Sequence, residues 1–566
     1  MSRSEPHAPA AAPSPLIGAA GRSVLWLLAF APALACATLV AQHAVDVPLG
    51  ADWARADLLE RGQAASGSPD LRGALSRLVA LANLHGLGND LRLEMALAWA
   101  LVLATALCVH GLLRRSFGAG GALYGITFLA NLLLFSPLQW ENFLWADRAL
   151  CFLPTAALSA GLLALGSRRS SPPGFAAWAL LAAGVLGLWL AVGGIESTAG
   201  MASGGAFEVL RFCTTMLGSG FSRTTLVAPG ELAPGLGMTL AVLFVAVAVW
   251  PATRWREAAF RARRLPWAIF GGYALLLALV AALGRGAGGP AEPLLPRYTS
   301  VSLYLCLATL PLAVLALEEL RGRVAAARPR LHAALEWAPA FGAGVLLVTA
   351  GLGWLVGVQG MAEWKSARLQ ARTSLVFLER FAPRHPERLG ASPQELRRAV
   401  GILDAHGYLD AYRARGDGIE PYANGEPLPD DAGRVDSAWF DEGRVVLDGF
   451  AWLPGPGRRA DGVLFTARDG DGSRRVIALA ELMGLLLPPI PEHDHIYNDA
   501  RIPGIDELAA WDAEIPAAAL PRAAHVLVEA FAVDSDAMRV HRLAGSVVVR
   551  STQAGLRAEL RSDGAP

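Results

Sequence analysis

Two carboxylates follow the first long apolar run of the sequence, within a polar segment at 43–94. They are Asp46 and Asp52. A carboxylate in such a position can accept the proton of an attacking hydroxyl, or hold a divalent metal ion against a phosphate group. The same segment carries other acidic residues, so each of the two can also be an ordinary solvated loop carboxylate. Asp46 and Asp52 are the candidate catalytic residues.

An arginine stands directly before a later apolar run, followed by a tyrosine. The guanidinium of Arg297 can hold a phosphate through two parallel hydrogen bonds. The alternative is an anchor at the membrane surface, with Tyr298 among the aromatic residues that gather there. We predict that Arg297 and Tyr298 bind the phosphate of a lipid.

A short polar segment separates two other apolar runs. Residues 137–145 read Pro-Leu-Gln-Trp-Glu-Asn-Phe-Leu-Trp. Trp140 suits a membrane interface, whereas Glu141 and Asn142 need polar partners at that depth. The three residues are predicted to line the outer end of a binding cavity. The alternative is a capped helix start with tryptophan anchors.

The sequence offers little for a resident metal ion. The five cysteines form no C-x-x-C pair, and four of them fall in apolar runs. His493 and His495 have H-x-H spacing, but no third ligand lies near them in the sequence. We predict no dedicated metal site, apart from a divalent metal held by the candidate carboxylates.

The elements that carry these residues have the composition of membrane helices. Of the 566 residues, 54% are hydrophobic and 17% are charged, against about 25% charged in soluble domains. The 49 basic and 49 acidic residues cancel, which argues against nucleic-acid binding. Nine apolar runs are long enough to cross a membrane as helices. They are 24–42, 95–113, 119–137, 149–166, 175–193, 236–253, 266–284, 299–317 and 338–359.

Arginine placement predicts the orientation. With the N-terminus inside, every short arginine cluster falls on the inner side, which matches the usual cytoplasmic excess of basic residues. This places a multi-pass protein in a bacterial inner membrane with its C-terminal part outside. Alternatively, residues 24–37 form the apolar region of a signal peptide. No Asp, Glu, Lys or Arg lies within the nine runs, which disfavours a transporter.

One outer segment has helical spacing of apolar residues. Residues 206–217 place Phe207, Leu210 and Cys213 on one face. This pattern predicts a helix that lies on the outer membrane surface or one that packs on the helical bundle.

The composition changes after the last apolar run. Residues 360–566 hold 24 basic and 31 acidic residues, a net charge of −7. The predicted domains are a tail at 1–23, a transmembrane domain at 24–359, a helical connector at 360–433, a β-rich module at 434–551 and a tail at 552–566. In the connector, Ser392, Pro393 and Glu395 predict a capped helix that ends near Gly407.

The module beyond the connector has the pattern of short strands. Strand-like runs occur at 444–447, 462–466, 475–478, 525–528 and 545–549. Asp469-Gly470-Asp471-Gly472 indicates a hairpin turn, and a helical insertion is expected near 478–487. The fold class is thus an α-helical polytopic membrane protein with an extracytoplasmic α+β, mostly β module.

Two of these segments resemble a known group. The run at 135–145, with its Gln-Trp-Glu-Asn core, and Arg297-Tyr298-Thr299 are similar to signatures of bacterial polytopic membrane proteins that resemble GT-C glycosyltransferases. The resemblance covers about residues 20–320. It implies transfer of a sugar from a polyprenyl-phosphate donor to a glycan or lipid acceptor at the outer face. It also implies a catalytic Asp52 or Asp46.

The sequence departs from the group in the first outer loop. The group's acidic-plus-tryptophan element is matched by Asp52-Trp53, but its His-Asn-Glu-His-Arg element is replaced by residues 68–72. If that element is catalytic, this chain is predicted to be impaired or inactive. The alternative function is a non-catalytic scaffold or accessory subunit of envelope assembly, whose β module binds a protein partner.

Overall fold

The computed structural model covers most of the chain in ordered segments. It describes residues 19–61, 71–167, 205–224, 229–250, 252–285, 292–324, 329–381, 389–409, 418–419, 422–454, 458–468, 474–480, 482, 509–552 and 555–561. The chain divides into two compact units. The helical unit comprises Met1–Gln42, Met95–Phe143 and Arg148–Gly360, and the mixed unit comprises His43–Glu94, Leu144–Asp147 and Met361–Pro566.

The described residues contain eight helical segments long and apolar enough to cross a membrane. These segments are Gly21–His43, Leu91–Phe117, Gly121–Leu144, Ala146–Leu165, Pro229–Val249, Ala258–Leu283, Pro296–Val324 and His332–Val376. They correspond to eight of the nine predicted runs, and the ninth, at 175–193, lies outside the described residues. The chain is therefore a multi-pass membrane protein by the length and hydropathy of its helices.

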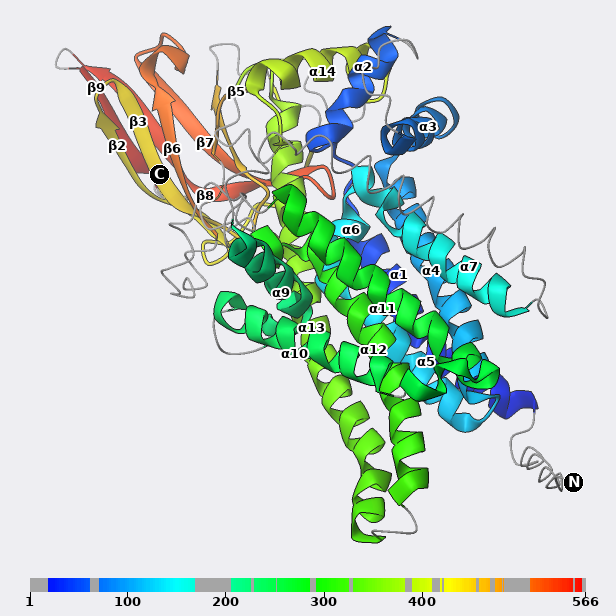
Figure 1. Ribbon diagram of the computed structural model, residues 1–566. Helices are drawn as coiled ribbons and strands as arrows, with labels where there is room; N and C mark the ends of the chain where they lie inside the picture. The colour runs from blue at the N-terminus through cyan, green and yellow to red at the C-terminus, as the bar shows by residue number, and fades with distance from the viewer. Residues whose placement is uncertain are drawn as a thin grey trace, which may run out of the picture. The chain divides into compact units, whose positions relative to one another are not determined.

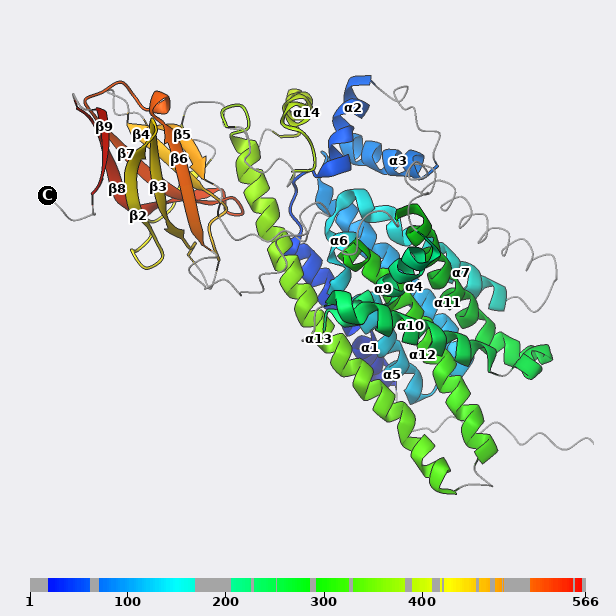
Figure 2. The same cartoon turned by 60° about the vertical axis from the view of Figure 1, so that its left-hand side comes forward.

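Five of the described helices extend beyond both ends of the apolar runs that predict them, whereas those at 121–134, 153–167 and 229–249 leave part of their runs outside the helix (Figures 1 and 2). The long helices are α1 Ala19–His43, α4 Leu91–Phe117, α5 Gly121–Leu134, α7 Leu153–Ser167, α9 Ala206–Ser222, α10 Pro229–Val249, α11 Ala258–Arg285, α12 Pro296–Val324 and α13 Pro329–Val376. Short helices are η3 Pro137–Gln139, α6 Trp140–Leu144, η4 Ala146–Phe152, η6 Ala252–Arg256 and η7 Glu292–Leu294. The helices therefore include charged residues that lie outside the apolar runs. Glu94 lies in the first turn of α4, and Arg297 in that of α12.

Polar side chains satisfy the backbone of α1 near its proline. Pro32 lies inside the helix and has no N–H to donate. The amide of Asn131 on α5 donates to the carbonyl of Ala29 at 2.7 Å, and the indole of Trp99 on α4 donates to that of Ala33 at 3.0 Å. The carbonyl that Pro32 leaves without a helical donor is that of Leu28, so these two bonds are additional contacts next to the proline, and they hold α1 against α4 and α5.

Helices α9 and α10 cross at very short range because both carry glycine at the contact. A Cβ atom on Gly218 would overlap the carbonyl of Ala233, and one on Gly237 would overlap that of Thr214. The C-terminal half of α9 is buried, whereas Phe207 and Leu210 near its start are exposed. Of the two interpretations of residues 206–217, packing on the bundle therefore holds for this half.

The helices of the mixed unit come from both ends of the sequence. They are η1 Gly50–Trp53, α2 Ala54–Arg61, α3 Leu71–Gly86, the end of α13 and α14 Pro393–Ala405. Helix α2 packs on α14 (Figures 1 and 2). The predicted capping box is confirmed, since Ser392 Oγ accepts from the Glu395 backbone N–H and the Glu395 carboxylate accepts from that of Ser392. Gly407 follows the helix at φ +76°.

The rest of the mixed unit is a sheet that is nearly closed into a barrel (Figures 1 and 2). Its strands are β1 Ala423–Asn424, β2 Gly433–Asp441, β3 Arg444–Ala451, β4 Val463–Arg468, β5 Arg474–Ala480, β6 Ala510–Pro516, β7 His525–Asp534, β8 Arg539–Thr552 and β9 Gly555–Arg561. The main order is β5-β4-β7-β8-β2-β3-β6, with β1 and β9 paired to β8. Leu482, just after β5, bridges Trp511 in β6, which brings the two ends of the sheet together.

Two hydrophobic cores hold this unit together. The first lies inside the barrel and includes Phe465 and Trp511. The second core lies on the other face of the sheet, at Leu464 and Phe531. There the sheet packs against α14, the end of α13 and the segment after α1, which contributes Trp53. Strands β4 and β7 are buried on both faces, which explains their continuous apolar sequences. Residues 45–56 thus pack in the same unit as the C-terminal sheet.

The strand predictions are incomplete. The five predicted runs fall on β3, β4, β5, β7 and β8, with Gly462 just outside β4, but β1, β2, β6 and β9 were not predicted. Strand β9 falls in the segment predicted as a tail. The prediction of a helical insertion near 478–487 is wrong at 478–480, because these residues belong to β5. A short apolar run fits a helix and a buried strand equally well. Residues 483–487 and the predicted turn at 469–472 lie outside the described residues.

Candidate functional site

Asp52 is positioned by the short helices that follow α1. It lies in η1, and its carboxylate accepts from the Leu49 backbone N–H at 3.1 Å. Arg55, one turn later on α2, reaches the other carboxylate oxygen at 3.5 Å. Trp53 beside it donates its indole N–H to the Leu389 carbonyl at 2.9 Å. The candidate base is therefore held rigidly from both sides.

Arg55 joins Asp52 to a second carboxylate. Its guanidinium donates to Glu94 at 2.7 Å and to the Asn89 amide oxygen at 3.0 Å. Asn83 donates to the other oxygen of Glu94 at 2.7 Å. We name Asp52, Arg55, Asn83, Asn89 and Glu94 the loop-one cluster. All five side chains are buried, and two carboxylates share one guanidinium.

The environment of Asp52 suits proton transfer near neutral pH. Burial raises the pKa of its carboxyl to about 7, with the Arg55 guanidinium opposing and Asp147 and Glu94 adding to the rise. A carboxyl with this pKa is partly ionised at pH 7 and can accept a proton. It is also only 3% exposed, so a substrate reaches it only if neighbouring chain moves.

Asp46, the other candidate base, has a structural partner. Its carboxylate accepts from the Leu91 backbone N–H at 3.0 Å, at the first turn of α4. A carboxylate at a helix N-terminus is stabilised by the free N–H groups there. Burial nevertheless raises the pKa of Asp46 above its ordinary value, with the Leu91 N–H opposing.

The two segments that carry the family resemblance meet in the helical unit. Glu141 in α6 lies 4.0 Å from the guanidinium of Arg297 at the start of α12. Asn142 donates to the Arg297 carbonyl and to the Ser300 hydroxyl, both at 2.9 Å. Glu292 in η7 lies 3.7 Å from Arg297 and accepts from the Tyr298 hydroxyl at 3.2 Å. We name Glu141, Asn142, Glu292, Arg297 and Tyr298 the α12-start cluster.

Several polar atoms of this region lack hydrogen bonds within the described residues. They are Glu141 Oε2, Arg297 Nε and Thr299 Oγ1, all of them buried. The Arg297 ion pairs of 3.7 and 4.0 Å are longer than hydrogen bonds. Buried polar atoms in native proteins nearly always have a partner, so such a group indicates a place for water or a ligand.

Trp140 packs inside the helical unit. It is buried, and a Cβ atom on Gly360 of α13 would meet its indole ring at 2.5 Å. This contact places Trp140 against a helix rather than at a lipid-facing interface. Tyr298 is partly exposed, and the Arg297 guanidinium lies 5.2 Å from its ring centre.

The sequence does not single out five participants in these clusters. They are Arg55, Asn83, Asn89, Glu94 and Glu292. The sequence could have indicated Arg55 as a partner of Asp52, because an acidic and a basic residue three positions apart lie on the same face of a helix. Glu94 stands at the edge of a predicted span, so its position suggested a boundary rather than a site. The other contacts depend on tertiary structure alone.

Metal binding receives no support from the described side chains. Among the residues that the structure describes, no group of three or more His, Cys, Asp or Glu side chains could hold a metal ion. His493, His495 and residues 68–70 lie outside the described residues.

Comparisons with protein families, curated proteins and solved structures find no match to this chain.

Proposed function

We propose that this protein is a GT-C-like glycosyltransferase that moves a sugar from a polyprenyl-phosphate donor to an envelope glycan or lipid acceptor. The observation that carries the proposal is the α12-start cluster. Two segments about 150 residues apart, which carry the resemblance to the GT-C-like group, meet there at Arg297. Buried polar atoms without hydrogen bonds lie at the same place, as expected of a site for a polar ligand.

Arg297 is assigned to the donor phosphate. Its guanidinium presents a planar set of donors that matches two phosphate oxygens, and the side chain is only partly exposed, at 16%. Glu141 and Glu292 orient the guanidinium through ion pairs of 4.0 and 3.7 Å. A phosphate can replace these long contacts with hydrogen bonds.

Asp52 is assigned as the general base. The acceptor hydroxyl oxygen attacks the anomeric carbon of the sugar while its proton passes to the Asp52 carboxylate. The bond between the anomeric carbon and the phosphate oxygen breaks, and the polyprenyl phosphate leaves with its electron pair and negative charge. The pKa of about 7 suits this role, since a base works best when its pKa lies near the working pH.

The test is a deletion strain complemented with single variants, with envelope glycans and glycolipids profiled by mass spectrometry. Wild type should restore the lost sugar, whereas Asp52→Asn and Arg297→Gln should not. Matched controls are Asp57→Asn, an exposed carboxylate on α2, and Arg211→Gln, an exposed arginine on α9. Each variant must be present at the wild-type level. Full restoration by both site variants would overturn the proposal.

A second function is favoured by the closed state of the loop-one cluster. Asp52 is only 3% exposed, and hydrogen bonds engage both of its carboxylate oxygens. Such a cluster can simply hold the first outer loop against the sheet, as in a non-catalytic accessory subunit. In that case Asp52→Asn and Arg297→Gln restore every glycan. Variants that unfold the mixed unit then cause the loss of a partner protein from the purified complex.

A further inference from the structure

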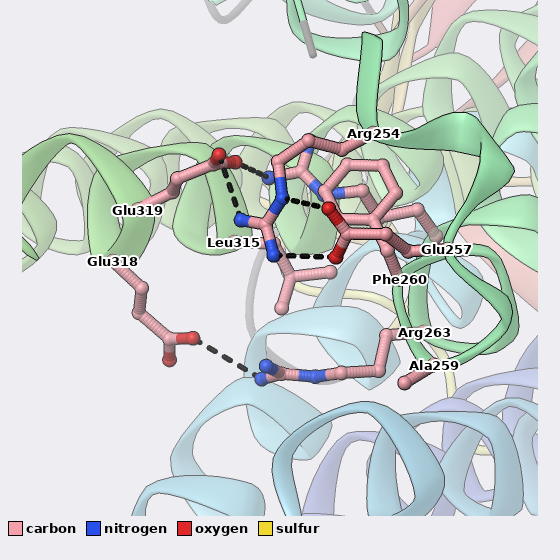
Figure 3. A pocket seen from close by; sticks show the side chains of 9 residues that line it. Arg254, Glu257, Ala259, Phe260, Arg263, Leu315, Glu318 and Glu319 are labelled. Carbon is pink, nitrogen blue, oxygen red and sulfur yellow. Dashed lines mark hydrogen bonds and ion pairs between the residues drawn. The ribbon is translucent and has the colours of Figure 1, made fainter. Parts of the chain in front are cut away.

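A cavity of about 340 Å³ lies at the other end of α12, away from the α12-start cluster, between η6, α11 and the last turns of α12 (Figure 3). Three arginines and three glutamates line it, together with Phe260. They are Arg254, Arg263, Arg264, Glu257, Glu318 and Glu319. The charges of this lining cancel, so the cavity offers both signs of charge in a small volume.

One wall of the cavity is a closed network of ion pairs. Arg254 makes two hydrogen bonds to the Glu257 carboxylate, at 2.8 and 2.7 Å, and a third to Glu319 at 3.0 Å. Arg264 is 3% exposed, lies 3.5 Å from Glu319, and stacks 4.7 Å from the centre of the Phe260 ring. Figure 3 shows Arg254 between the carboxylates of Glu257 and Glu319. The charged groups of this wall already bind one another, so few of their hydrogen-bonding atoms remain for a ligand.

The other wall is a single exposed pair. Arg263 on α11 lies 3.1 Å from Glu318 on α12, and both side chains are 46% exposed. Arg263 also donates to the Ser116 carbonyl at 2.6 Å, which fixes its direction. An exposed ion pair contributes little to stability, so the two partners can separate at small cost. Arg263 can then bind an anion, and Glu318 a cation.

The cavity lies at the depth of lipid headgroups. The apolar run of α11 begins at Pro266, and that of α12 ends at Leu317. Arg263 and Glu318 therefore stand at the boundary between hydrocarbon and water. Trp250, at the end of α10 nearby in the sequence, is 60% exposed, as expected of an aromatic residue at this interface.

We propose that this cavity binds the headgroup of a zwitterionic phospholipid with a primary amine, such as phosphatidylethanolamine. Arg263 binds the phosphate through charge-assisted hydrogen bonds, and Glu318 accepts hydrogen bonds from the ammonium group. A purely anionic headgroup would leave Glu318 without a partner and face its negative charge. A choline headgroup has no N–H to donate. The inference does not depend on the proposed function.

The test is lipid titration of the purified full-length protein in detergent, followed by native mass spectrometry. Phosphatidylethanolamine should bind about tenfold more tightly than phosphatidylglycerol or phosphatidylcholine of the same chain length. Glu318→Gln should remove the preference for ethanolamine over choline. Arg263→Gln should weaken binding of both lipids. Glu336→Gln and Arg256→Gln, which change exposed residues outside the cavity lining, should leave all affinities unchanged.

Three results would overturn the inference. Phosphatidylglycerol could bind as tightly as phosphatidylethanolamine, or Glu318→Gln could keep the ethanolamine preference. Soluble glycerophosphoethanolamine could also compete at concentrations similar to the lipid, which would assign the cavity to a free metabolite. An exposed ion pair contributes little to stability, so Glu318→Gln should melt at the wild-type temperature, and Arg263→Gln, which also loses the bond to the Ser116 carbonyl, should melt within a few degrees of it.

Discussion

Arg55 is the residue on which the loop-one cluster depends. Its guanidinium lies between the carboxylates of Asp52 and Glu94, at 3.5 and 2.7 Å, and all three side chains are buried. Removing one member of a buried ion pair leaves an uncompensated charge, which costs far more than the loss of an exposed pair. The cluster joins η1 and α2 to the first turn of α4, so its loss would release η1 and α2 from that turn.

We expect Arg55→Met to destabilise the mixed unit by about 3–5 kcal/mol. The measurement is the thermal unfolding midpoint of the purified protein, followed by tryptophan fluorescence. Arg398→Met is the matched control, because Arg398 makes exposed pairs with Asp57 and Glu60. The control should melt within a degree or two of the wild type. An equal effect of the two variants would show that the cluster carries no special stability.

Two buried carboxyl groups make the stability of this unit depend on pH. Asp461, just before β4, accepts from the Ser535 backbone N–H at 2.7 Å and from Arg458 at 3.4 Å. Burial raises the pKa of Asp461 and of Asp52 to about 7, from an ordinary value of 3.8. The folded unit therefore binds these protons more tightly than the unfolded chain does.

The sign of the pH effect follows. The protonated carboxyl groups of Asp52 and Asp461 contribute to the free energy of unfolding. This contribution is complete below about pH 4 and is lost as the pH rises through about 7. We expect a lower unfolding midpoint at pH 8 than at pH 5.5. Asp461→Asn should remove part of the dependence of the unfolding midpoint on pH. The double variant Asp461→Asn with Asp52→Asn should remove most of it. Asp436→Asn, at an exposed carboxylate, should keep the wild-type slope. A wild-type midpoint that rises between these two pH values would contradict the assignment.

At the scale of elements, the crossing of α9 and α10 is the most constrained contact of the helical unit. Gly218 and Gly237 let each backbone touch a carbonyl of the other helix. Close packing of small residues is the main source of helix association in membranes. The buried half of α9 also packs against α12, the helix whose first turn carries Arg297.

Gly237→Ala should separate α9 and α10 and lower the yield and thermal midpoint of the purified protein. Gly235→Ala is its matched control, because a Cβ atom there meets nothing within 4 Å. Alanine is favoured over glycine in a helix by about 0.5–1 kcal/mol, so the control should be neutral or slightly stabilising. Loss of stability in the control alone would refute the close-contact argument.

At the scale of the whole molecule, the number of spans determines the side of the C-terminal sheet. Eight candidate spans lie in the described residues, and a ninth is predicted at 175–193. With nine spans the two ends of the chain are on opposite sides of the membrane. Arginine placement then predicts an outer location for the sheet and for the loop-one cluster.

We expect alkaline phosphatase fused after Arg561 to be active, because that enzyme folds only outside the cytoplasm. A fluorescent protein fused at the same place should stay dark. Fusions after residue 167 and after residue 205 should report opposite sides, since residues 175–193 lie between them. Activity on the same side at both points would reduce the count to eight and put the sheet on the inner side.

Several features could be predicted from the sequence because they depend on local physical chemistry. Apolar length determines which segments can span a membrane, and eight of the nine predicted runs are found as long helices. The capping box at Ser392 and the start of α14 follow from hydrogen bonds within one turn. The short apolar run at 445–447 predicted β3, whose two faces differ in burial.

Other features were decided by the tertiary structure. Arg297 and Glu141 are far apart in the sequence and meet only in the folded chain. No pattern of apolar residues in the sequence predicts this contact. The partners of Asp52 come from α2 and α4, and its raised pKa is a property of burial, which the sequence around it does not show. Strands β2, β6 and β9 form because neighbouring strands satisfy their backbone groups. Local sequence selects the elements, whereas long-range packing decides which side chains meet.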